Sequence, residues 1–196
     1  MRVIMIIAHP DDEVIFGFHD LIHNDVTVIC MTNGDNNIRK GEFYQSMKLS
    51  GAKGHILNYP DSSNDTWTQF AVEDFYNKDF KHLITQSTGI NIYELVVSHG
   101  PNGEYGNKQH IRTHAIARHF ANEIGLPFKT FQERYRPSDY ATHLEKYNML
   151  VNNYVSQKKA ISSLIHFFQK DTKATKNGKI VAGQVPNLSL LTKKLK

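Results

Sequence analysis

The sequence has little cysteine and no long apolar run, and each of these absences excludes a class of protein. Its 196 residues include one cysteine, Cys30, so the chain forms neither an internal disulfide nor a cysteine-based zinc site. Its apolar runs are all shorter than the roughly 18 residues that a membrane-spanning helix needs. The N-terminal stretch MRVIMIIA is strand-like and too short for a signal peptide. We therefore expect a soluble, cytoplasmic, globular protein.

Most of the chain also lacks an excess of basic residues. The net charge is +4, but residues 170–196 contain seven lysines and one acidic residue, and the rest of the chain contains 16 basic and 18 acidic residues. Proteins that bind nucleic acid usually gather basic residues on one face of the folded body. Because this body has no basic excess, we predict no nucleic-acid partner.

Alternating strand and helix patterns predict the fold. Continuous apolar runs, typical of strands buried on both faces of a parallel sheet, occupy Arg2–Ala8, Asp25–Met31 and Glu94–Ser98. Amphipathic helical patterns occupy Phe43–Lys53, Thr68–Gln86, His110–Ile124 and Tyr140–Lys170. This alternation predicts an α/β, Rossmann-like, three-layer fold with helices on both faces of a mostly parallel sheet. We expect one domain over residues 1–170, continued by a basic C-terminal tail, 171–196, that includes a short strand-like VAGQVP.

Polar residues follow each of the three predicted strands. They are His9–Glu13 after the first strand, Thr32–Asp35 after the second and His99–His110 after the third. In open α/β sheets, ligands bind beyond the carboxyl ends of the strands. The sequence therefore predicts a functional site at this edge of the sheet, built from the first and third of these segments above all.

The segment His9–Glu13 supplies one imidazole and three carboxylates within five residues. Imidazole nitrogen and carboxylate oxygen are ligands that zinc accepts, so the segment is a candidate metal site. An alternative interpretation is a helix N-terminus, because Asp11, Asp12 and Glu13 would also favour the start of a helix. Taken alone, the residues of this segment favour the helix N-terminus.

His110 adds a candidate metal ligand at the start of a predicted helix. Together with one histidine and one carboxylate of the first segment, it would form a two-histidine, one-carboxylate site with one position left open for water. His99 and His114 are alternative ligands at this stage. His114 lies one helical turn beyond His110, so the two could share a face of the helix.

Several motifs, taken in order, resemble the LmbE/PIG-L family of zinc-dependent N-acetylglucosaminyl deacetylases. They are AHPDDE (8–13), TNGD (32–35), Arg39 with Glu42, HGPNGEYG (99–106) followed by His110, and the late Tyr154–Gln157. The resemblance covers most of the chain, and AHPDDE at the end of the first strand is its most specific motif. It implies that Zn²⁺, or another divalent ion, binds to His9, Asp12 and His110.

The resemblance also implies catalytic roles for other residues. Asp11 matches the general base that accepts a proton from water, and Tyr105 matches a tyrosine that helps to stabilise the oxyanion. Arg39 matches an arginine that contacts the sugar, and we assign His99 to the substrate-binding residues as well. The chain departs from the family pattern at Asn107, where many members have a histidine. Asn107 can donate a hydrogen bond to an oxyanion but cannot carry a proton to the leaving amine, so we expect Asp11 to return the proton that it took.

These interpretations predict a metal-dependent amidohydrolase that removes the N-acetyl group from an N-acetylglucosamine-type sugar or sugar conjugate. The alternative within the family is a catalytically weak or inactive sugar-binding relative, for which Asn107 is the reason. A nucleotide-binding module is a third hypothesis, and the absence of a G-x-G-x-x-G pattern argues against it. The expected partner is a small N-acetylated amino sugar or its conjugate, and the sequence leaves open whether the chain forms a homo-oligomer.

Overall fold

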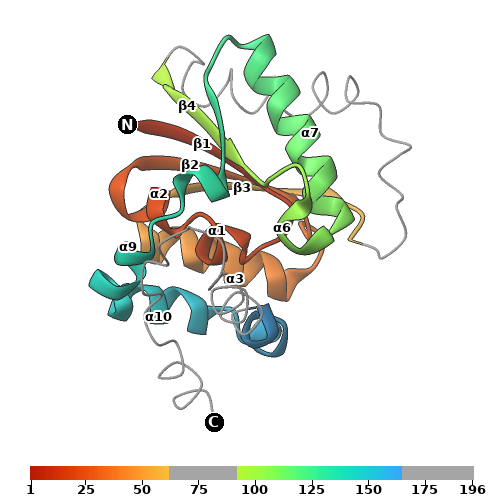
Figure 1. Ribbon diagram of the computed structural model, residues 1–196. Coiled ribbons are helices and arrows are strands. Elements are labelled where there is room, and N and C mark those ends of the chain that lie inside the picture. Colours follow the sequence, from red (N-terminus) through yellow and green to blue (C-terminus); the bar gives the residue numbers. More distant parts are fainter. Residues whose placement is uncertain (62–91, 165–196) are drawn as a thin grey trace, which may run out of the picture.

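The three predicted strands form the centre of a parallel sheet. The computed structural model describes residues 1–61 and 92–164, and within them the sheet has five strands, all parallel, in the order β3-β2-β1-β4-β5 (Figure 1). The strands are β1 (Arg2–Ile7), β2 (Asp25–Thr32), β3 (Lys53–Tyr59), β4 (Leu95–Ser98) and β5 (Phe128–Thr130). The predicted α/β, Rossmann-like fold is confirmed.

The central strand β1 determines where the site forms. Ile7 of β1 pairs with Cys30 of β2, and Ile6 pairs with Ser98 of β4. Since parallel strands end at the same edge of a sheet, the segments that begin at His9 and His99 leave the sheet as neighbours. The polar segment after β1 therefore lies beside the polar segment after β4, although they are about 90 residues apart.

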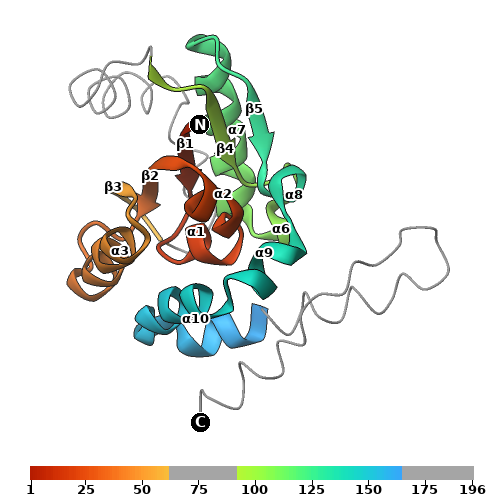
Figure 2. The ribbon, with the colours of Figure 1, turned by 90° about the vertical axis from the view of Figure 1, so that its left-hand side faces the viewer.

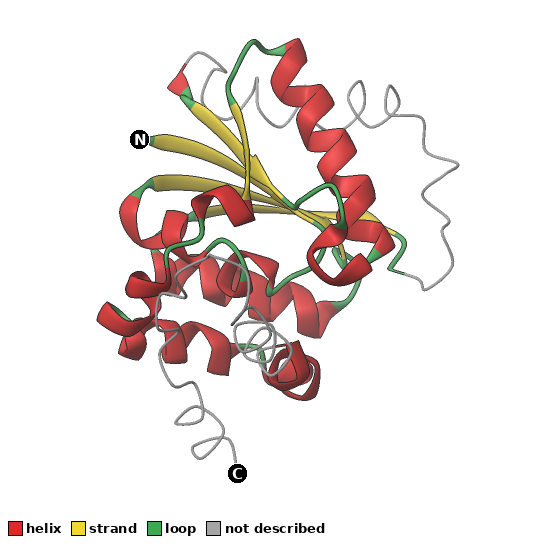
Figure 3. Cartoon of the chain, viewed as in Figure 1, coloured by secondary structure: helices red, strands yellow, loops and turns green. Residues whose placement is uncertain are grey.

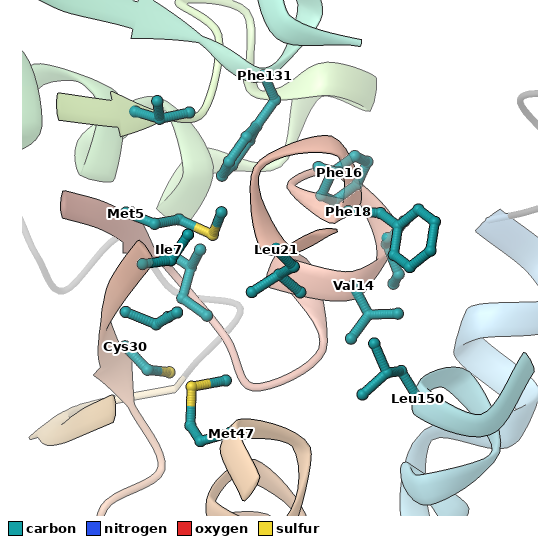
Figure 4. Packing of buried hydrophobic residues seen from close by; sticks show 14 of the residues in the cluster. Met5, Ile7, Val14, Phe16, Phe18, Leu21, Cys30, Met47, Phe131 and Leu150 are labelled. Atoms are coloured by element: carbon teal, nitrogen blue, oxygen red, sulfur yellow. The ribbon is translucent and has the colours of Figure 1, made fainter. Parts of the chain in front are cut away.

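Successive residues of β1 point to opposite faces of the sheet, and each face has its own helices. On one face, Met5 and Ile7 pack with α1 (Asp12–Ile15), α2 (Phe18–His23), α3 (Asn37–Ser50) and α10 (Leu144–Asn153). On the other, Ile4 and Ile6 pack with residues of α7 (Lys108–Glu123). Figures 1 and 2 show α7 on the opposite side of the sheet from α3 and α10. Figure 4 shows part of the first core, in which Met5 and Ile7 lie near Leu21 of α2 and Met47 of α3. The strands are apolar throughout because both faces are covered.

Three further helices are short. They are α6 (Gly103–Gly106), which precedes α7, α8 (Phe131–Arg134), which follows β5, and α9 (Pro137–Thr142), which precedes α10. The helix predicted at Phe43–Lys53 begins earlier, because the side chain of Asn36 accepts hydrogen bonds from the amides of Ile38 and Arg39. It ends at Ser50, and Gly51 follows with a left-handed φ of 84°.

The single long helix predicted over Tyr140–Lys170 is wrong. The chain instead forms α9, α10 and the 3-10 turn η4 (Val155–Gln157), and a new helical segment starts at Lys158 (Figure 3). Tyr154 separates α10 from η4 with non-helical dihedral angles and is buried against the core. The apolar spacing continues across these breaks because the successive segments pack against the same core.

The prediction missed two edge strands, and some of the predicted elements lie outside the described residues. The edge strands β3 and β5 were not among the predicted strands; β3 is only half-buried and β5 has three residues. The predicted helix Thr68–Gln86, the strand-like VAGQVP and the tail 171–196 lie outside the described residues. Within the described residues, none of the helices combines the length and the apolar character that crossing a membrane requires.

Candidate metal centre and active site

The turn after β1 has an unusual backbone at Asp11. Its φ is 109°, a left-handed conformation that is unfavourable for a residue with a Cβ and is found mostly where function requires it. The amide of His9 donates to Oδ2 of Asp12 at 2.8 Å, which closes the turn. The segment is also a helix N-terminus, as the alternative interpretation predicts, because Asp11 is the N-cap of α1 and Asp12 and Glu13 lie in its first turn. The side chain of Asp11 makes no capping hydrogen bond.

The structure brings the three predicted metal ligands, His9, Asp12 and His110, together; we call them the sheet-edge cluster. Nδ1 of His9 lies 3.4 Å from Oδ2 of Asp12, Nε2 of His110 lies 3.4 Å from Oδ1 of Asp12, and the two nitrogens are 3.3 Å apart. With bonds of about 2.0–2.1 Å, two ligands of a tetrahedral zinc ion are separated by about 3.3 Å. The residues present therefore fit a bound divalent ion.

The outer nitrogens of both histidines are held by acceptors. Nε2 of His9 lies 2.6 Å from Oε1 of Gln109, and Nδ1 of His110 lies 2.7 Å from Oε2 of Glu104. A ring nitrogen that donates to an amide or carboxylate oxygen carries the proton, so the opposite nitrogen presents its lone pair. The inner nitrogens of the two rings therefore face each other as acceptors, an arrangement that a cation between them stabilises.

Glu104 supports the site from a strained backbone, with a φ of 56°. Its Oε2 accepts from Nδ1 of both His110 and His99, and its Oε1 accepts from the amide of Gly100 at 2.8 Å. Burial would raise the pKa of Glu104, but the hydrogen bonds from the two histidines outweigh it and lower the pKa to about 2. The carboxylate is therefore ionised and orients both rings.

The alternative ligands His99 and His114 do not join the sheet-edge cluster. Nε2 of His99 lies 3.1 Å from the amide nitrogen of Ala8 and 3.3 Å from Oδ2 of Asp12. Burial would lower the pKa of His99, but the carboxylates of Asp12 and Glu104 on either side of the ring raise it to about 9. His114 points elsewhere, with Nδ1 2.8 Å from the carbonyl oxygen of His99.

Asp11, the predicted base, lies beside the sheet-edge cluster and is nearly buried. Burial and the charge of Asp12 raise the pKa of Asp11 well above its ordinary value, although Arg39 opposes this. The guanidinium of Arg39 lies 3.6 Å from Oδ2 of Asp11 and donates to the carbonyl oxygen of Pro10 at 2.5 Å. Arg39 is only 6% exposed, and its Nε has no hydrogen-bond partner among the described residues. The arginine thus braces the turn that carries Asp11.

Glu13 holds the same turn from the buried side. Its Oε2 accepts from the amide of Asp11 at 3.0 Å, and its Oε1 accepts from the hydroxyl of Ser46 at 2.8 Å and from the hydroxyl of Tyr154. Glu13 has no exposed surface, and burial raises its pKa. These bonds connect the unusual backbone of Asp11 to α3 and to the break after α10. The helix is interrupted at Tyr154 because this residue turns inward to bond to Glu13.

Two of the motifs behind the family resemblance also meet in space. The carboxylate of Glu42 accepts from the amide of Ser156 at 2.7 Å and from its hydroxyl at 2.6 Å. Asn153 donates to the carbonyl oxygen of Glu42 at 2.7 Å. The late segment Tyr154–Gln157 therefore fastens the C-terminal helices to α3 and, through Tyr154, to the site.

Tyr105 and Asn107 lie at the entrance to α7. Oδ1 of Asn107 accepts from the amides of Gln109 and His110, so Asn107 is the N-cap of the helix that carries a predicted ligand. Its Nδ2 donates to the hydroxyl of Tyr105 at 3.2 Å. Burial and the charge of Asp12 raise the pKa of Tyr105 to about 12, so the phenol keeps its proton at neutral pH.

Glu104 and Gln109 support the site although neither was predicted as a site residue. Gln109 also donates to the carbonyl oxygen of Pro60 at 3.0 Å, and Asp61 lies 3.6 Å from Nε2 of His9. Glu104 belongs to the HGPNGEYG motif and Gln109 immediately precedes His110, so proximity to the candidate ligands was the available signal.

Comparison with known proteins agrees with this geometry. A protein of Acanthamoeba polyphaga mimivirus, "Uncharacterized protein L374", is 34% identical over 125 residues, which cover 55% of this chain and 52% of that protein. A Corynebacterium efficiens protein named 1D-myo-inositol 2-acetamido-2-deoxy-alpha-D-glucopyranoside deacetylase is 28% identical over 159 residues, covering 63% and 50%. A protein of the same name from Corynebacterium diphtheriae is 27% identical over 162 residues, covering 64% and 54%.

The chain spans about half the length of the curated relatives that it matches. The family described as PIG-L, GlcNAc-PI de-N-acetylase, matches residues 4–121, which run from within β1 into the last turn of α7 and contain the whole sheet-edge cluster. On this match, together with the arrangement of His9, Asp12 and His110, the chain belongs to the PIG-L family.

Proposed function

We propose that this protein is a zinc-dependent deacetylase that hydrolyses the N-acetyl amide of an N-acetylglucosamine-type sugar or sugar conjugate. The observation that carries the proposal is the triangle of His9, Asp12 and His110, whose ligand atoms are separated by the edge length of a tetrahedral site. The names of the corynebacterial relatives, which are deacetylases of a 2-acetamido sugar linked to inositol, support the substrate class.

His9, Asp12 and His110 would hold the ion. A bound divalent ion supplies Lewis acidity, which lowers the pKa of water and polarises an amide carbonyl. Burial and the neighbouring His99 lower the pKa of His110, which favours the neutral ring that a metal needs. Gln109 and Glu104 fix the orientation of the two rings from outside.

Asp11 is the proton acceptor in this proposal. Its raised pKa brings the carboxyl nearer to the operating pH, which suits a group that takes a proton from water and later returns it to the leaving amine. Glu13 holds its backbone amide, and Arg39 lies beside its carboxylate. The charges of Asp12 and His9 both act on the carboxyl of Asp11, so this carboxyl lies close to the place where the water would react.

Tyr105, Asn107, Arg39 and His99 take supporting roles. The phenol of Tyr105 stays protonated and is a hydrogen-bond donor for the developing oxyanion. Nδ2 of Asn107 orients that phenol, and the Oδ1 of Asn107 is engaged in capping α7. His99 has no exposed surface, so we assign it to orienting Glu104 and Asp12 rather than to direct contact with the sugar. Arg39 is nearly buried, so we assign it an indirect role in sugar binding, in which it holds the Pro10–Asp11 turn in place.

The test is amine release from N-acetylglucosaminyl-inositol by the zinc-loaded chain. We expect turnover by the wild type, loss of both zinc and turnover in His110→Ala, and unchanged turnover in His119→Gln, which alters an exposed histidine on the same helix. Absence of amine release from zinc-loaded wild type would overturn the hydrolase. If calorimetry then still showed sugar binding, the result would favour an inactive sugar-binding relative, the alternative that Asn107 raises.

A further inference from the structure

A second group of histidine and aspartate side chains lies away from the sheet edge. His19 and His23 are four residues apart on α2, so they lie on one face of that helix. Asp139 belongs to α9, which packs against α2 in Figures 1 and 2. We call His19, His23 and Asp139 the helix cluster.

The carboxylate of Asp139 meets both rings. Its Oδ2 lies 2.5 Å from Nδ1 of His19, and its Oδ1 lies 3.1 Å from Nε2 of His23. The three possible ligand atoms lie within 4.8 Å of one another. The ring of His143 is near as well, with its centroid 6.0 Å from that of His23.

We infer that the helix cluster is a second binding site for a borderline divalent ion such as Zn²⁺, separate from the sheet-edge cluster. Two imidazoles and one carboxylate without a thiolate suit zinc, cobalt, nickel or copper better than magnesium or calcium, which prefer oxygen ligands alone. A histidine pair four residues apart on a helix is already aligned for chelation, so little conformational entropy is lost when it binds.

The ion replaces protons that the metal-free cluster shares between its rings and its carboxylate. Nδ1 of His19 and Oδ2 of Asp139 are closer than two ligands of one ion, so binding separates them by about 0.8 Å. The cluster has room for this change because the side chain of His23 is 44% exposed. The same exposure leaves a coordination position for water or for His143.

The bound ion acts as a clamp between distant parts of the chain. Asp139 is 120 residues from His19, and α9 leads directly into α10, which lies outside α1 and α3. The clamp adds to the ion pair in which the buried Asp20 of α2 accepts from Arg134 at 2.6 Å. Metal binding at the helix cluster therefore stabilises the attachment of the C-terminal helices to the N-terminal part.

The experiment counts zinc equivalents bound to the full metal-free chain by calorimetry and by elemental analysis after gel filtration. We expect two equivalents for the wild type. The double variant His19→Gln/His23→Gln and the single variant Asp139→Asn should each bind one equivalent, at the sheet-edge cluster. His110→Ala should also bind one equivalent, at the helix cluster. His119→Gln, the matched histidine control, should keep two.

A second measurement separates loss of a ligand from loss of the fold. The second equivalent should raise Tm of the wild type and leave Tm of Asp139→Asn unchanged, while that variant still binds its first equivalent. A single equivalent in the wild type, or two equivalents in both the double variant and Asp139→Asn, would overturn the inference. Neither result depends on turnover, so the outcome is distinct from that of the deacetylase test.

Discussion

The sheet-edge cluster and the helix cluster contain the same donors in different surroundings. At the sheet edge, Gln109 and Glu104 hold the outer nitrogens of the two histidines, and the carboxylate of Asp12 is nearly buried. In the helix cluster, the side-chain hydrogen bonds of His19 and His23 within the described residues go to Asp139 alone. The two clusters thus have the same ligand types, but among the described residues additional side chains orient the histidines by hydrogen bonds only at the sheet edge.

This difference in support predicts different binding. Outer hydrogen bonds fix the tautomer and orientation of a ligating histidine, and their loss commonly weakens metal binding by about 10–100-fold. The sheet-edge cluster is therefore expected to bind zinc tightly in a fixed geometry. The helix cluster, which is more exposed and must rearrange slightly, is expected to bind zinc more weakly and to exchange it faster.

The largest expected effect separates catalysis from metal binding. Asp11→Asn should keep zinc at both clusters and lower kcat/KM by about 10²–10⁴-fold, because the amide cannot accept a proton. Steady-state kinetics together with elemental analysis check this, with Asp139→Asn as the control that should lose zinc from the helix cluster and retain kcat/KM. Near-normal turnover in zinc-loaded Asp11→Asn would show that another group is the base.

The second prediction concerns acid stability of the metal-free protein. Glu104 has its pKa lowered from 4.5 to about 2, and a lowered pKa contributes stability that is present above the unfolded-state value and is lost as pH falls through the folded-state value. The contribution of the Glu104 carboxylate to the free energy of unfolding is roughly 3 kcal/mol. The difference in unfolding free energy between wild type and Glu104→Gln should therefore shrink between pH 4.5 and 2 in denaturant titrations. A constant difference over that range would contradict the ion-pair role of Glu104.

The third prediction tests the outer hydrogen bonds directly. Glu104→Gln should weaken zinc binding at the sheet-edge cluster by about 10–100-fold, since a neutral amide orients and polarises His110 less well than a carboxylate. Binding at the helix cluster should stay the same, which competition titration with a chelator measures. Equal weakening at both clusters would mean that the variant acts through the fold as a whole.

The smallest effect concerns Asn107. Asn107→Ala should lower the free energy of unfolding by about 0.5–2 kcal/mol, because α7 loses its N-cap. Asn107→Asp keeps an oxygen for the cap but loses the donor to Tyr105, so it should retain stability and lower kcat. Chemical denaturation and kinetics of the two variants separate the two roles, and zinc at the helix cluster should be unaffected in both. Equal stability of Asn107→Ala and wild type would refute the capping role.

The sequence predicts the buried parts of the fold better than its edges. The runs that became β1, β2 and β4 are apolar throughout because the sheet is covered on both faces, so their pattern identifies them. β3 has mixed polarity, since its residues are only half-buried at the edge, and β5 is too short to show a pattern. The break at Tyr154 has neither glycine nor proline and follows from its bond to the distant Glu13, which no local pattern reveals.

The same distinction applies to the site. His9, Asp12 and His110 stand at predicted strand and helix ends, where topology indicates that they converge. Glu104 reaches two histidines only because its backbone takes a left-handed conformation, and the choice between His99, His110 and His114 as ligands depends on which ring nitrogen faces the cluster. These features depend on exact side-chain geometry, so the sequence left the three histidines as alternatives.

The parallel pairing of β1 with β4 also decides when a metal can act on the folding of this chain. His9 and His110 are 101 residues apart in sequence, and the pairing of these two strands places them side by side. Closing so long a loop precedes the formation of the binding site, so the ion meets a chain that has already crossed most of its folding barrier. Zinc at the sheet edge should therefore slow unfolding and leave the folding rate almost unchanged. On the proposed function, a bound ion would stabilise the folded state and would take no part in the nucleation of folding.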